Sequence, residues 1–407
     1  MTNRYAALKY RDFRLLWYGQ LLSTIGNQMM MVALNWHIYL LTKSAFSLGM
    51  LGLVRFFPII IFSLIAGNIA DVHNRKKIQF ICAIFLGGLS IILATMTFTD
   101  TVTPLTIYIL TALSAIFASL ETPARQAFLP KLVSKEHLPN AFSLNIIMWQ
   151  TASIVGPALA GFLIAEFSVG SIYVFDAISF AAVLVSLLLI KTKGTIEGGV
   201  VKMSIKSIIE GFTFVRSKTI IWSTMLLDFF STFFSSAYAL LPIFAQDVLH
   251  VGPQGLGILF AAPGIGAVLA GFVMAHMHNL KKQGMILLIS VGVYGAATVI
   301  FGFSTSFTLS LFALFLIGAG DSVSAVIRNT IRQIATPDHL RGRMTGVNMI
   351  FFKGGPQLGE FEAGLLAAAV GGPWSVVIGG IGTILAVGVM AYMIPTLRKY
   401  QGDEVYT

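Results

Sequence analysis

Residues 67–77 read GNIADVHNRKK and separate two long apolar runs, at residues 46–70 and 78–98. The stretch holds a carboxylate, Asp71, together with one imidazole and three cations, whereas the chain as a whole is 56% hydrophobic and only 11% charged. A helix needs about 20 apolar residues to cross the hydrocarbon core of a bilayer, and both runs reach that length. Basic clusters between such runs are typical of cytoplasmic loops. The stretch therefore predicts an integral membrane protein with helical spans.

Apolar runs of spanning length recur along the whole chain, separated by polar and often basic stretches. They predict twelve transmembrane helices, which would place both ends of the chain on the same side of the membrane. The runs lie at residues 16–41, 46–70, 78–98, 104–124, 140–166, 171–191, 219–245, 254–276, 283–303, 307–330, 344–370 and 374–395.

The distribution of Lys and Arg predicts the orientation. The expected outer loops carry only Lys43, and Arg55 and Lys353 lie within spans, whereas the other cations lie on the opposite side. Because cytoplasmic loops are enriched in Lys and Arg, we expect cytoplasmic N- and C-termini and a location in the plasma membrane, the inner membrane of a bacterial cell. The net charge of +10 then follows from topology, so no nucleic-acid partner is expected.

Signatures of a cofactor, a metal or an enzyme are missing from the sequence. The single Cys82 excludes a disulfide within the chain and a Cys-based zinc site. The His residues show no HExxH pairing, and GxxxxGK[ST] does not occur, which disfavours direct use of ATP. An intramembrane enzyme would need clustered His, Asp or Ser at one membrane face. We therefore expect no cofactor, no metal and no enzymatic activity.

A polar interruption at residues 192–218 predicts the domain organisation. It would separate a six-helix bundle at residues 1–191 from a second at residues 219–407, and its later part has the pattern of an interfacial amphipathic helix. The halves also resemble each other at an offset of 203 residues. Parallel repeats of six spans are a transporter architecture. The matching pairs are Asn145 and Asn348, Gly156 and Gly359, and Gly161 and Gly364.

Along its whole length the chain resembles the major facilitator superfamily. The stretch at 67–77 is similar to the signature loop between the second and third spans, and GPALAG at 156–161 is similar to the span-5 motif of exporters. Val72 and Asn74 depart from the loop motif, which usually has Arg and Gly there. The residues that match the two motifs are Gly67, Ala70, Asp71, Arg75 and Lys76 in the loop, and Gly156, Pro157 and Gly161 in span 5.

Other stretches resemble the branch that holds enterobactin exporters and macrolide efflux proteins. They are RDFRLLWYGQLLSTIGNQM, PARQAFLPKLVSKEHLPNA, DAISF and PDHLRGRMTG. The resemblance implies an all-α fold of two pseudo-symmetric six-helix bundles and export of an amphipathic organic solute (a drug, a macrolide or a siderophore) by alternating access. It also implies protons as the coupling ion, although span 4 lacks the Arg of many drug/proton antiporters.

Other functions stay open at this stage. A lipid or lysophospholipid transporter and an uptake symporter are alternatives within transport, and a receptor or scaffold that transports nothing is an alternative outside it. We expect the protein to act as a monomer, with membrane lipids, a small amphipathic substrate and protons as its partners.

Charged side chains inside the membrane are functional candidates because burying them is costly. The proton-coupling candidates are Asp228, Asp321, Glu360 and Glu362. A buried carboxylate takes up a proton readily because burial disfavours its charged form. The gate and ion-pair candidates are Arg55 and Lys353, and we expect Arg55 to pair with Glu360 or Glu362 as an outer gate. A static ion pair is the alternative for each. Glu121 and Asp176 lie nearer to span ends, where we expect them to reach water or lipid headgroups more easily.

Polar and thioether side chains on three spans are candidates for the substrate cavity. In the superfamily's fold, spans 1, 4, 7 and 10 line that cavity. The candidates are Gln20, Ser23, Asn27 and Met30 in span 1, Thr232 and Ser235 in span 7, and Ser324 in span 10. Ordinary helix packing is the alternative.

The signature loop resembles a latch. The resemblance implies that Gly67, Asp71, Arg75 and Lys76 close the cytoplasmic side, with Asp71 engaging span 11. The cations of the loop are placed to reach lipid phosphates. We interpret Gly156, Pro157 and Gly161 as structural, since proline bends a helix and glycine allows close helix approach.

Overall fold

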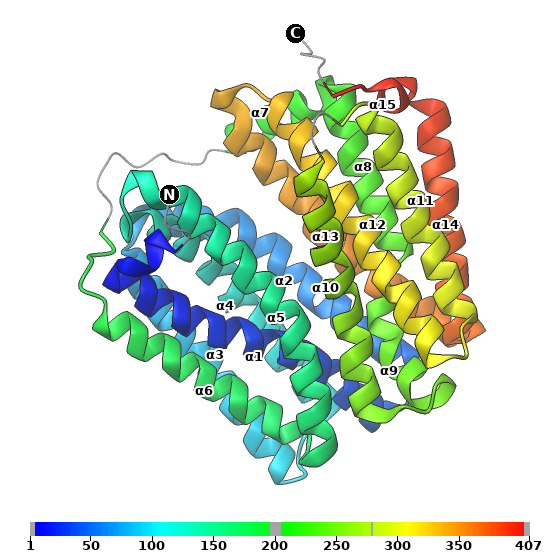
Figure 1. The fold of residues 1–407 in the computed structure, drawn as a ribbon. Coiled ribbons are helices and arrows are strands. Elements are labelled where there is room, and N and C mark those ends of the chain that lie inside the picture. The colour runs from blue at the N-terminus through cyan, green and yellow to red at the C-terminus, as the bar shows by residue number, and fades with distance from the viewer. Residues whose placement is uncertain (1–4, 196–204, 278–279, 403–407) are drawn as a thin grey trace. The chain divides into compact units, whose positions relative to one another are not determined.

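The computed structural model describes residues 5–195, 205–277 and 280–402, which form helices joined by short connections, with no strand among them (Figure 1). Part of the predicted linker, residues 196–204, lies outside the described residues. The helices are α1 (Arg11–Thr42), α2 (Ala45–Val72), α3 (Arg75–Phe98), α4 (Pro104–Phe128), α5 (Leu138–Glu166), α6 (Val169–Leu189), α7 (Ile205–Ser217), α8 (Thr219–Phe234), α9 (Leu241–Ile243), α10 (Gly252–His276), α11 (Gln283–Phe303), α12 (Phe307–Ile334), α13 (Arg341–Val370), α14 (Gly372–Met393) and α15 (Pro395–Lys399).

Short helical turns connect the long helices. Among the described residues, five of these turns are of the 3₁₀ type, and Phe244–Val248 is a π-helical turn. The 3₁₀ turns are Ala6–Lys9, Leu129–Lys131, Lys135–His137, Ala237–Leu240 and Asp338–Leu340.

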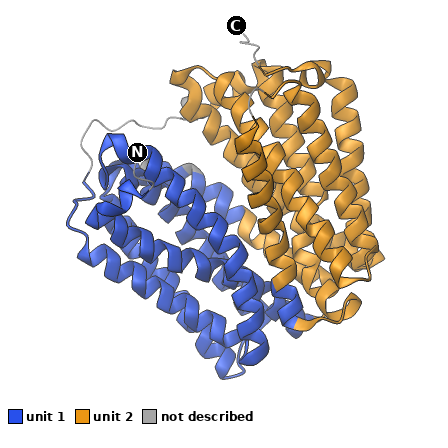
Figure 2. Cartoon of the chain, viewed as in Figure 1, with its two compact units in different colours: residues 1–42, 57–202, 253–257 blue, residues 43–56, 203–252, 258–407 orange. Residues whose placement is uncertain are grey.

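The chain divides into two compact units (Figure 2). Unit 1 comprises residues 1–42, 57–202 and 253–257, and unit 2 comprises residues 43–56, 203–252 and 258–407. Helices α2 and α10 are each divided between the units. The first part of α2 belongs to unit 2, and the first turn of α10 belongs to unit 1.

Glycine pairs allow both of these short segments to pack closely. In unit 1, a Cβ atom added to Gly161 of α5 would lie 2.9 Å from the Cα of Gly257. In unit 2, a Cβ atom added to Gly49 of α2 would lie 2.9 Å from the Cα of Gly364 in α13. Such approaches exclude any larger residue and favour dispersion contacts between backbones. Gly161 therefore makes the kind of close helix approach that the sequence predicts for the span-5 motif.

Each unit has its own apolar core. In unit 1, α1 packs on α5 and α6, and α3 packs on α4 and α6, with Phe13 and Phe128 in the core. In unit 2, α11 packs on α12 and α14, and α8 packs on α13, with Met225 and Ile331 in the core. Helix α7 packs on α13, where Glu210 pairs with Arg343 at 2.7 Å.

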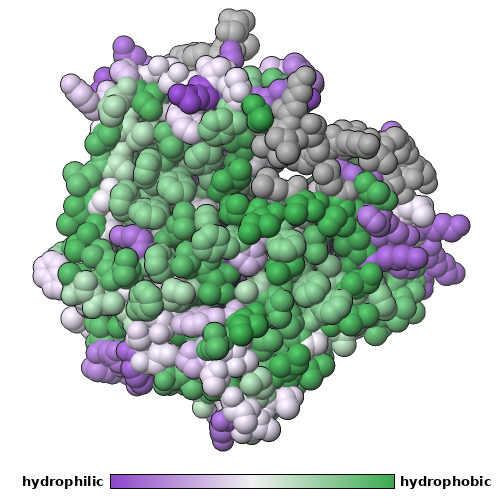
Figure 3. All heavy atoms as spheres, turned by 180° about the vertical axis from the view of Figure 1, so that it is seen from behind, coloured by the Kyte–Doolittle hydropathy of each residue, from purple (hydrophilic) through white to green (hydrophobic). Residues whose placement is uncertain are grey.

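The described helices fit a membrane-embedded protein. Ten of them are long and apolar enough to cross a bilayer, and much of the face in Figure 3 is apolar. Of the twelve predicted spans, α1 and α13 are long enough, with 32 and 30 residues, but do not reach the same hydropathy. Their polar side chains, including Gln20 in α1 and Glu360 in α13, explain the difference. The protein is an integral membrane protein.

Candidate functional site

A buried cluster of charged residues joins α8 to α12 in unit 2. Asp228 of α8 is only 2% exposed, and its Oδ1 lies 2.9 Å from Nη2 of Arg328. Nη1 of Arg332 lies 4.0 Å from the other oxygen, Oδ2. The arginines are 2% and 3% exposed and stand one helical turn apart on α12, so both guanidinium groups reach the same carboxylate.

Asp321 supplies the second carboxylate of the cluster. Its Oδ1 lies 3.4 Å from Nη2 of Arg328, and its side chain is 49% exposed. Nη1 of Arg328 donates to the hydroxyl of Ser324, which is fully buried. The spacing of these three residues, i, i+3 and i+7, places them on one face of α12. An ion pair therefore occupies this face of α12.

Arg332 is held by amide side chains as well as by charge. Its Nη2 donates to Oδ1 of Asn329 at 3.1 Å, and its Nη1 donates to Oδ1 of Asn348 in α13. Its Nε donates to the carbonyl oxygen of Arg328 at 3.1 Å. From the sequence, Arg332 counts among the cations of the cytoplasmic side, because it follows the apolar run at residues 307–330. The signal that could have found it is the four-residue spacing from Arg328.

The cluster is formally neutral but not fully hydrogen-bonded. It contains two arginines and two aspartates, which we name the Asp228 network: Asp228, Asp321, Arg328 and Arg332. Within the described residues, Oδ2 of Asp228 and Nε of Arg328 are buried without a hydrogen-bond partner. Unsatisfied polar atoms in a buried network are expensive. The network can therefore rearrange at a lower free-energy cost than a network in which every polar atom has a hydrogen-bond partner.

The hydroxyl groups predicted to line the cavity are engaged within unit 2. Thr232 donates to the carbonyl oxygen of Asp228 at 2.8 Å, one turn earlier in α8. Ser235 follows the end of α8, is buried, and lies 2.7 Å from the hydroxyl of Thr383. Together with Ser324, which accepts from Arg328, these side chains support helix packing and the Asp228 network.

The structure brings Arg55 to Glu360, as the sequence predicts. Nη1 of Arg55 lies 3.8 Å from Oε2 of Glu360, and the two side chains are 14% and 7% exposed. Both residues belong to unit 2, because residues 43–56 of α2 pack there. Gly52 makes room for the contact, since a Cβ atom at that position would lie 2.6 Å from Cβ of Glu360.

The other two charged candidates of α13 lie apart from this pair. Glu362 is half-buried and has no ion-pair partner among the described residues. Lys353 is exposed, and its Nζ lies 5.7 Å from the centre of the Phe352 ring. A cation over an aromatic face is a weak attraction at an exposed site. Lys353 forms no salt bridge within the described part of the chain.

The span-1 candidates differ in exposure. Ser23 is buried, Met30 is half-buried and Asn27 is exposed. Nε2 of Gln20 lies 3.4 Å from Oε1 of Glu121 in α4, and the same oxygen lies 3.1 Å from Nε of Arg125. Gln20 therefore belongs to a small polar cluster with these two residues of unit 1.

The prediction that Asp176 reaches water or lipid headgroups easily is wrong. Asp176 of α6 is 3% exposed, because α1 and α3 cover it. Its Oδ2 accepts from the Ser90 hydroxyl at 2.6 Å, and its Oδ1 has no hydrogen-bond partner among the described residues. Gly26 of α1 makes the burial possible, since a Cβ atom there would lie 2.9 Å from Oδ1 of Asp176.

The loop after α2 is held by contacts within unit 1. Asp71 lies 3.8 Å from Nη2 of Arg75, one helical turn later, and Gly67 is half-buried in α2. Arg75 also donates to the carbonyl oxygen of Ala127 at 2.9 Å. Lys76 donates to that of Ile190 at 2.7 Å. These two cations bind backbone carbonyls, which differs from the predicted role in reaching lipid phosphates.

Asn74, which stands where the family motif usually has Gly, has a local structural role that the motif does not predict. Its side chain accepts from the backbone N–H groups of Lys76 and Lys77 at 3.0 and 3.2 Å, and so caps the N-terminus of α3. Capping satisfies donors that have no partner inside the helix.

The span-5 motif is a packing site in unit 1. A Cβ atom at Gly156 would lie 2.7 Å from Cβ of Gln28 in α1. Pro157 is buried in the interior of α5, where it removes one backbone donor. With Gly161 against Gly257, the motif places two helices in close contact with α5.

Comparisons with known proteins agree with this architecture. The model of the transmembrane secretion effector family matches residues 2–405. The chain is 24% identical to the enterobactin exporter EntS of Citrobacter koseri (strain ATCC BAA-895 / CDC 4225-83 / SGSC4696), covering 96% of this chain and 93% of that protein. It is 26% identical to the multidrug efflux pump Tap of Mycolicibacterium fortuitum, covering 98% of each. The staphyloferrin A transporter of Staphylococcus aureus (strain NCTC 8325 / PS 47) is 28% identical, covering 93% of this chain and 95% of that protein.

Solved transporter structures share the fold. The nucleoside transporter NupG superimposes with a TM-score of 0.69 at 14% identity, covering 96% of this chain and 99% of that chain. A bacterial homologue of the iron transporter ferroportin, in an inward-facing state, gives a TM-score of 0.69 at 18% identity, covering 94% and 98%.

Proposed function

Because the chain belongs to the transmembrane secretion effector family of the major facilitator superfamily, and is a transporter rather than an enzyme, we propose that it exports an amphipathic organic solute in exchange for protons. The observation that carries this proposal is Asp228, a buried carboxylate between two arginines with one oxygen unsatisfied. A carboxylate in such a place can bind and release a proton while its partners remain charged.

Proton uptake at Asp228 would change the partners of Arg328. While Asp228 is charged, its Oδ1 holds Nη2 of Arg328 at 2.9 Å, and Asp321 shares the same nitrogen at 3.4 Å. Once Asp228 is neutral, the attraction across α8 and α12 falls and Asp321 remains as the carboxylate of Arg328. Protonation therefore loosens one helix contact without leaving the guanidinium unpaired. That is the kind of two-state element that alternating access needs.

The direction and the substrate class come from the relatives. Two of them are named exporters or efflux pumps, and one is named a transporter of staphyloferrin A. A siderophore or a drug is therefore the substrate class we propose. The proposal also includes cytoplasmic termini, a monomeric state and a location in the bacterial inner membrane, with the orientation supported by the distribution of Lys and Arg.

The proposed transport cycle also includes a gate and a cytoplasmic latch. We assign the pair of Arg55 and Glu360 to a gate, because a nearly buried ion pair that breaks must either find new partners or leave costly unpaired charges. We assign Asp71 to a cytoplasmic latch, on the basis of its exposed carboxylate at the end of α2. Residues 1–191 and 219–407 are the proposed transport domains, joined by residues 192–218.

Transport by inverted membrane vesicles tests the proposal. Erythromycin and enterobactin serve as probes, and their accumulation is followed with and without an imposed pH gradient. We expect accumulation of at least one probe that stops when an uncoupler collapses the gradient. Accumulation that survives the uncoupler would refute proton coupling. Vesicles that accumulate neither probe, alongside a deletion strain with unchanged susceptibility to a panel of drugs and siderophores, would refute export of this class.

A matched pair of variants ties the coupling to the network. Asp228→Asn keeps the shape of the side chain and removes the proton-binding group, so it should abolish accumulation driven by the gradient. Asp176→Asn makes the same change at a buried carboxylate of unit 1 that has no cation partner among the described residues, and should leave accumulation unchanged. If Asp228→Asn accumulates the probe as well as wild type does, Asp228 is not the coupling residue.

A further inference from the structure

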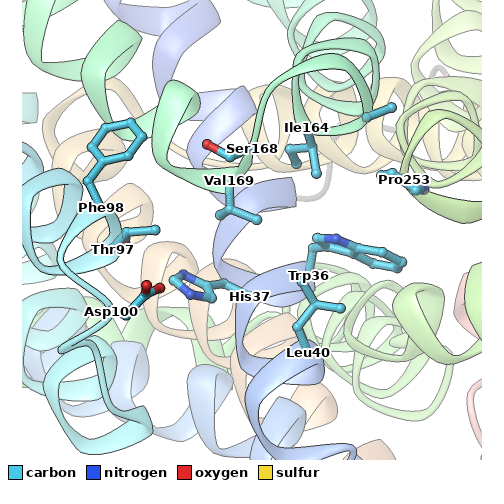
Figure 4. A pocket seen from close by; sticks show the side chains of 11 residues that line it. Trp36, His37, Leu40, Thr97, Phe98, Asp100, Ile164, Ser168, Val169 and Pro253 are labelled. Atoms are coloured by element: carbon cyan, nitrogen blue, oxygen red, sulfur yellow. The ribbon is translucent and has the colours of Figure 1, made fainter.

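A pocket lies at one end of unit 1, and none of its lining residues belongs to the Asp228 network or to the pair of Arg55 and Glu360. It has a volume of about 520 Å³, which is in the range of small-molecule sites. It is formed by the end of α1, the end of α3 and the turn after it, the end of α5 with the start of α6, and the first residue of the α10 segment (Figure 4). Its lining side chains include Trp36, His37, Phe98, Asp100 and Ser168.

His37 is built into the wall of this pocket. The residue is 6% exposed, and its Nδ1 lies 2.9 Å from the hydroxyl of Tyr173, which is fully buried. The two rings also stack, with centroids 5.8 Å apart. The hydrogen bond and the stacking fix the ring of His37. The other nitrogen, Nε2, has no hydrogen-bond partner within the described residues, although the side chain lines the pocket.

Asp100 provides the charge of the pocket. Among the residues that line the pocket, it is the one with a carboxylate side chain. It lies in the turn after α3 with a φ of 54°, a left-handed conformation that Asp tolerates better than most residues. Figure 4 shows its carboxylate and the imidazole of His37 pointing toward one another. The polar side of the pocket is therefore an acceptor for a cation.

Aromatic side chains form other parts of the wall. Trp36 is buried and Phe98 is exposed toward solvent. Gly170 leaves space for the Phe98 ring, since a Cβ atom there would lie 2.8 Å from its Cζ. Aromatic faces attract cations and also cover the alkyl part of an amphipathic amine. No Lys or Arg lines the pocket among the described residues.

We propose that this pocket binds a primary ammonium group, held between the carboxylate of Asp100 and the imidazole of His37, with the attached carbon chain against Trp36 and Phe98. The N–H groups of a primary ammonium supply donors for both partners, which a quaternary ammonium lacks. The ammonium belongs either to a free amine or to an ethanolamine lipid headgroup. The site does not depend on the proposed export function.

Fluorescence of Trp36 tests the proposal in the full-length protein. The other tryptophans (Trp17, Trp149, Trp222 and Trp374) are replaced by Phe. Phenylethylamine is then titrated in detergent, and we expect a saturable change in emission. Asp100→Asn should raise the Kd at least tenfold, whereas Glu166→Gln, which removes a carboxylate of unit 1 outside the pocket, should not. Phenyltrimethylammonium should bind more weakly than phenylethylamine.

The controls separate the possible outcomes. Equal losses in Asp100→Asn and Glu166→Gln would overturn the proposal, because the effect would then be one of general surface charge. A signal with inorganic phosphate and none with the amine would also overturn it. In nanodiscs of phosphatidylglycerol, loss of the amine signal when phosphatidylethanolamine is added identifies the lipid headgroup as the ligand. An unchanged signal identifies a free amine.

Discussion

Asp176 in unit 1 and Asp228 in unit 2 are both buried carboxylates inside membrane-spanning helices, but their partners differ. Asp176 accepts one hydrogen bond from a neutral hydroxyl at 2.6 Å, and no cation lies within ion-pair distance among the described residues. Asp228 has two arginines on a single neighbouring helix. Protonation of a carboxylate that has no cation partner breaks no ion pair. Protonation of a carboxylate that holds two guanidinium groups changes the ion pairs of both. The comparison therefore predicts a packing role for Asp176 and supports the proposed coupling role for Asp228.

The largest effect should come from truncating Asp228. Asp228→Ala leaves Arg328 and Arg332 buried with only Asp321 to balance them, and breaking a buried pair by removing one partner costs about 3–5 kcal/mol. We expect a large fall in the thermal stability of the purified protein, measured by its thermal unfolding. Asp228→Asn retains hydrogen bonding and should lose less. Similar stability of the wild type and of Asp228→Ala would mean that the network does not hold α8 to α12.

The pair of Arg55 and Glu360 should give the next largest effect. Glu360→Gln removes the charge that Arg55 faces at 3.8 Å and should slow transport several-fold, because Arg55 then lacks a counter-ion in a nearly buried place. The double variant Arg55→Gln/Glu360→Gln should recover part of the loss. Transport rates of the single and double variants measure the coupling, and additive losses would argue against a functional pair.

The sequence predicted this second site better than the first. The positions of Arg55, Glu360 and Glu362 in the outer halves of spans 2 and 11, together with the family resemblance, suggested that Arg55 pairs with one of the two glutamates. Spacing along α12 likewise placed Asp321, Ser324 and Arg328 on one face. The contact from Arg328 to Asp228 joins residues 100 positions apart, so it depends on how α8 packs on α12, which no local pattern encodes.

Burial was the other property that the sequence did not reveal. Asp176 lies only seven residues from the start of α6, yet α1 approaches it closely enough, at Gly26, to exclude water. Lys76 looked like a cation for lipid headgroups because it lies in a basic loop. Its use as a donor to the carbonyl of Ile190 depends on where the chain returns after α6.

Asp12 is a carboxylate of unit 1 that lies before the first predicted span, and we expect it to have a structural role. Its Oδ2 accepts from the backbone N–H groups of Lys191 and Thr192 at 3.0 and 2.8 Å. Burial alone raises the pKa of Asp12, but the hydrogen bonds from Thr192 and Lys191 outweigh it and leave the pKa below its usual value. Asp12→Ala should speed amide hydrogen exchange at Lys191 and Thr192, because hydrogen bonds to a charged group contribute about 1.5–3 kcal/mol.

The pH dependence of that protection has a definite sign. Since the folded pKa of Asp12 is lowered, its stabilising contribution is complete above the unfolded value of about 3.9 and is lost as the pH falls through the folded value. Asp12→Asn should remove this dependence. Protection at Thr192 that is equal in wild type and Asp12→Ala would show that the amide is held by other contacts.

The smallest effect is expected at Asp176, and it is the sharpest test of the comparison. Asp176→Asn keeps the shape of the side chain and an oxygen that accepts from Ser90, while removing a charge that no cation balances within the described residues. Since burying an unpaired charge is costly, the variant should be as stable as wild type or more stable. It should also accumulate the probe with unchanged dependence on the pH gradient. If Asp176→Asn abolished accumulation driven by the gradient while leaving stability intact, proton coupling would have to involve unit 1 as well, and the division of roles between the two carboxylates would be wrong.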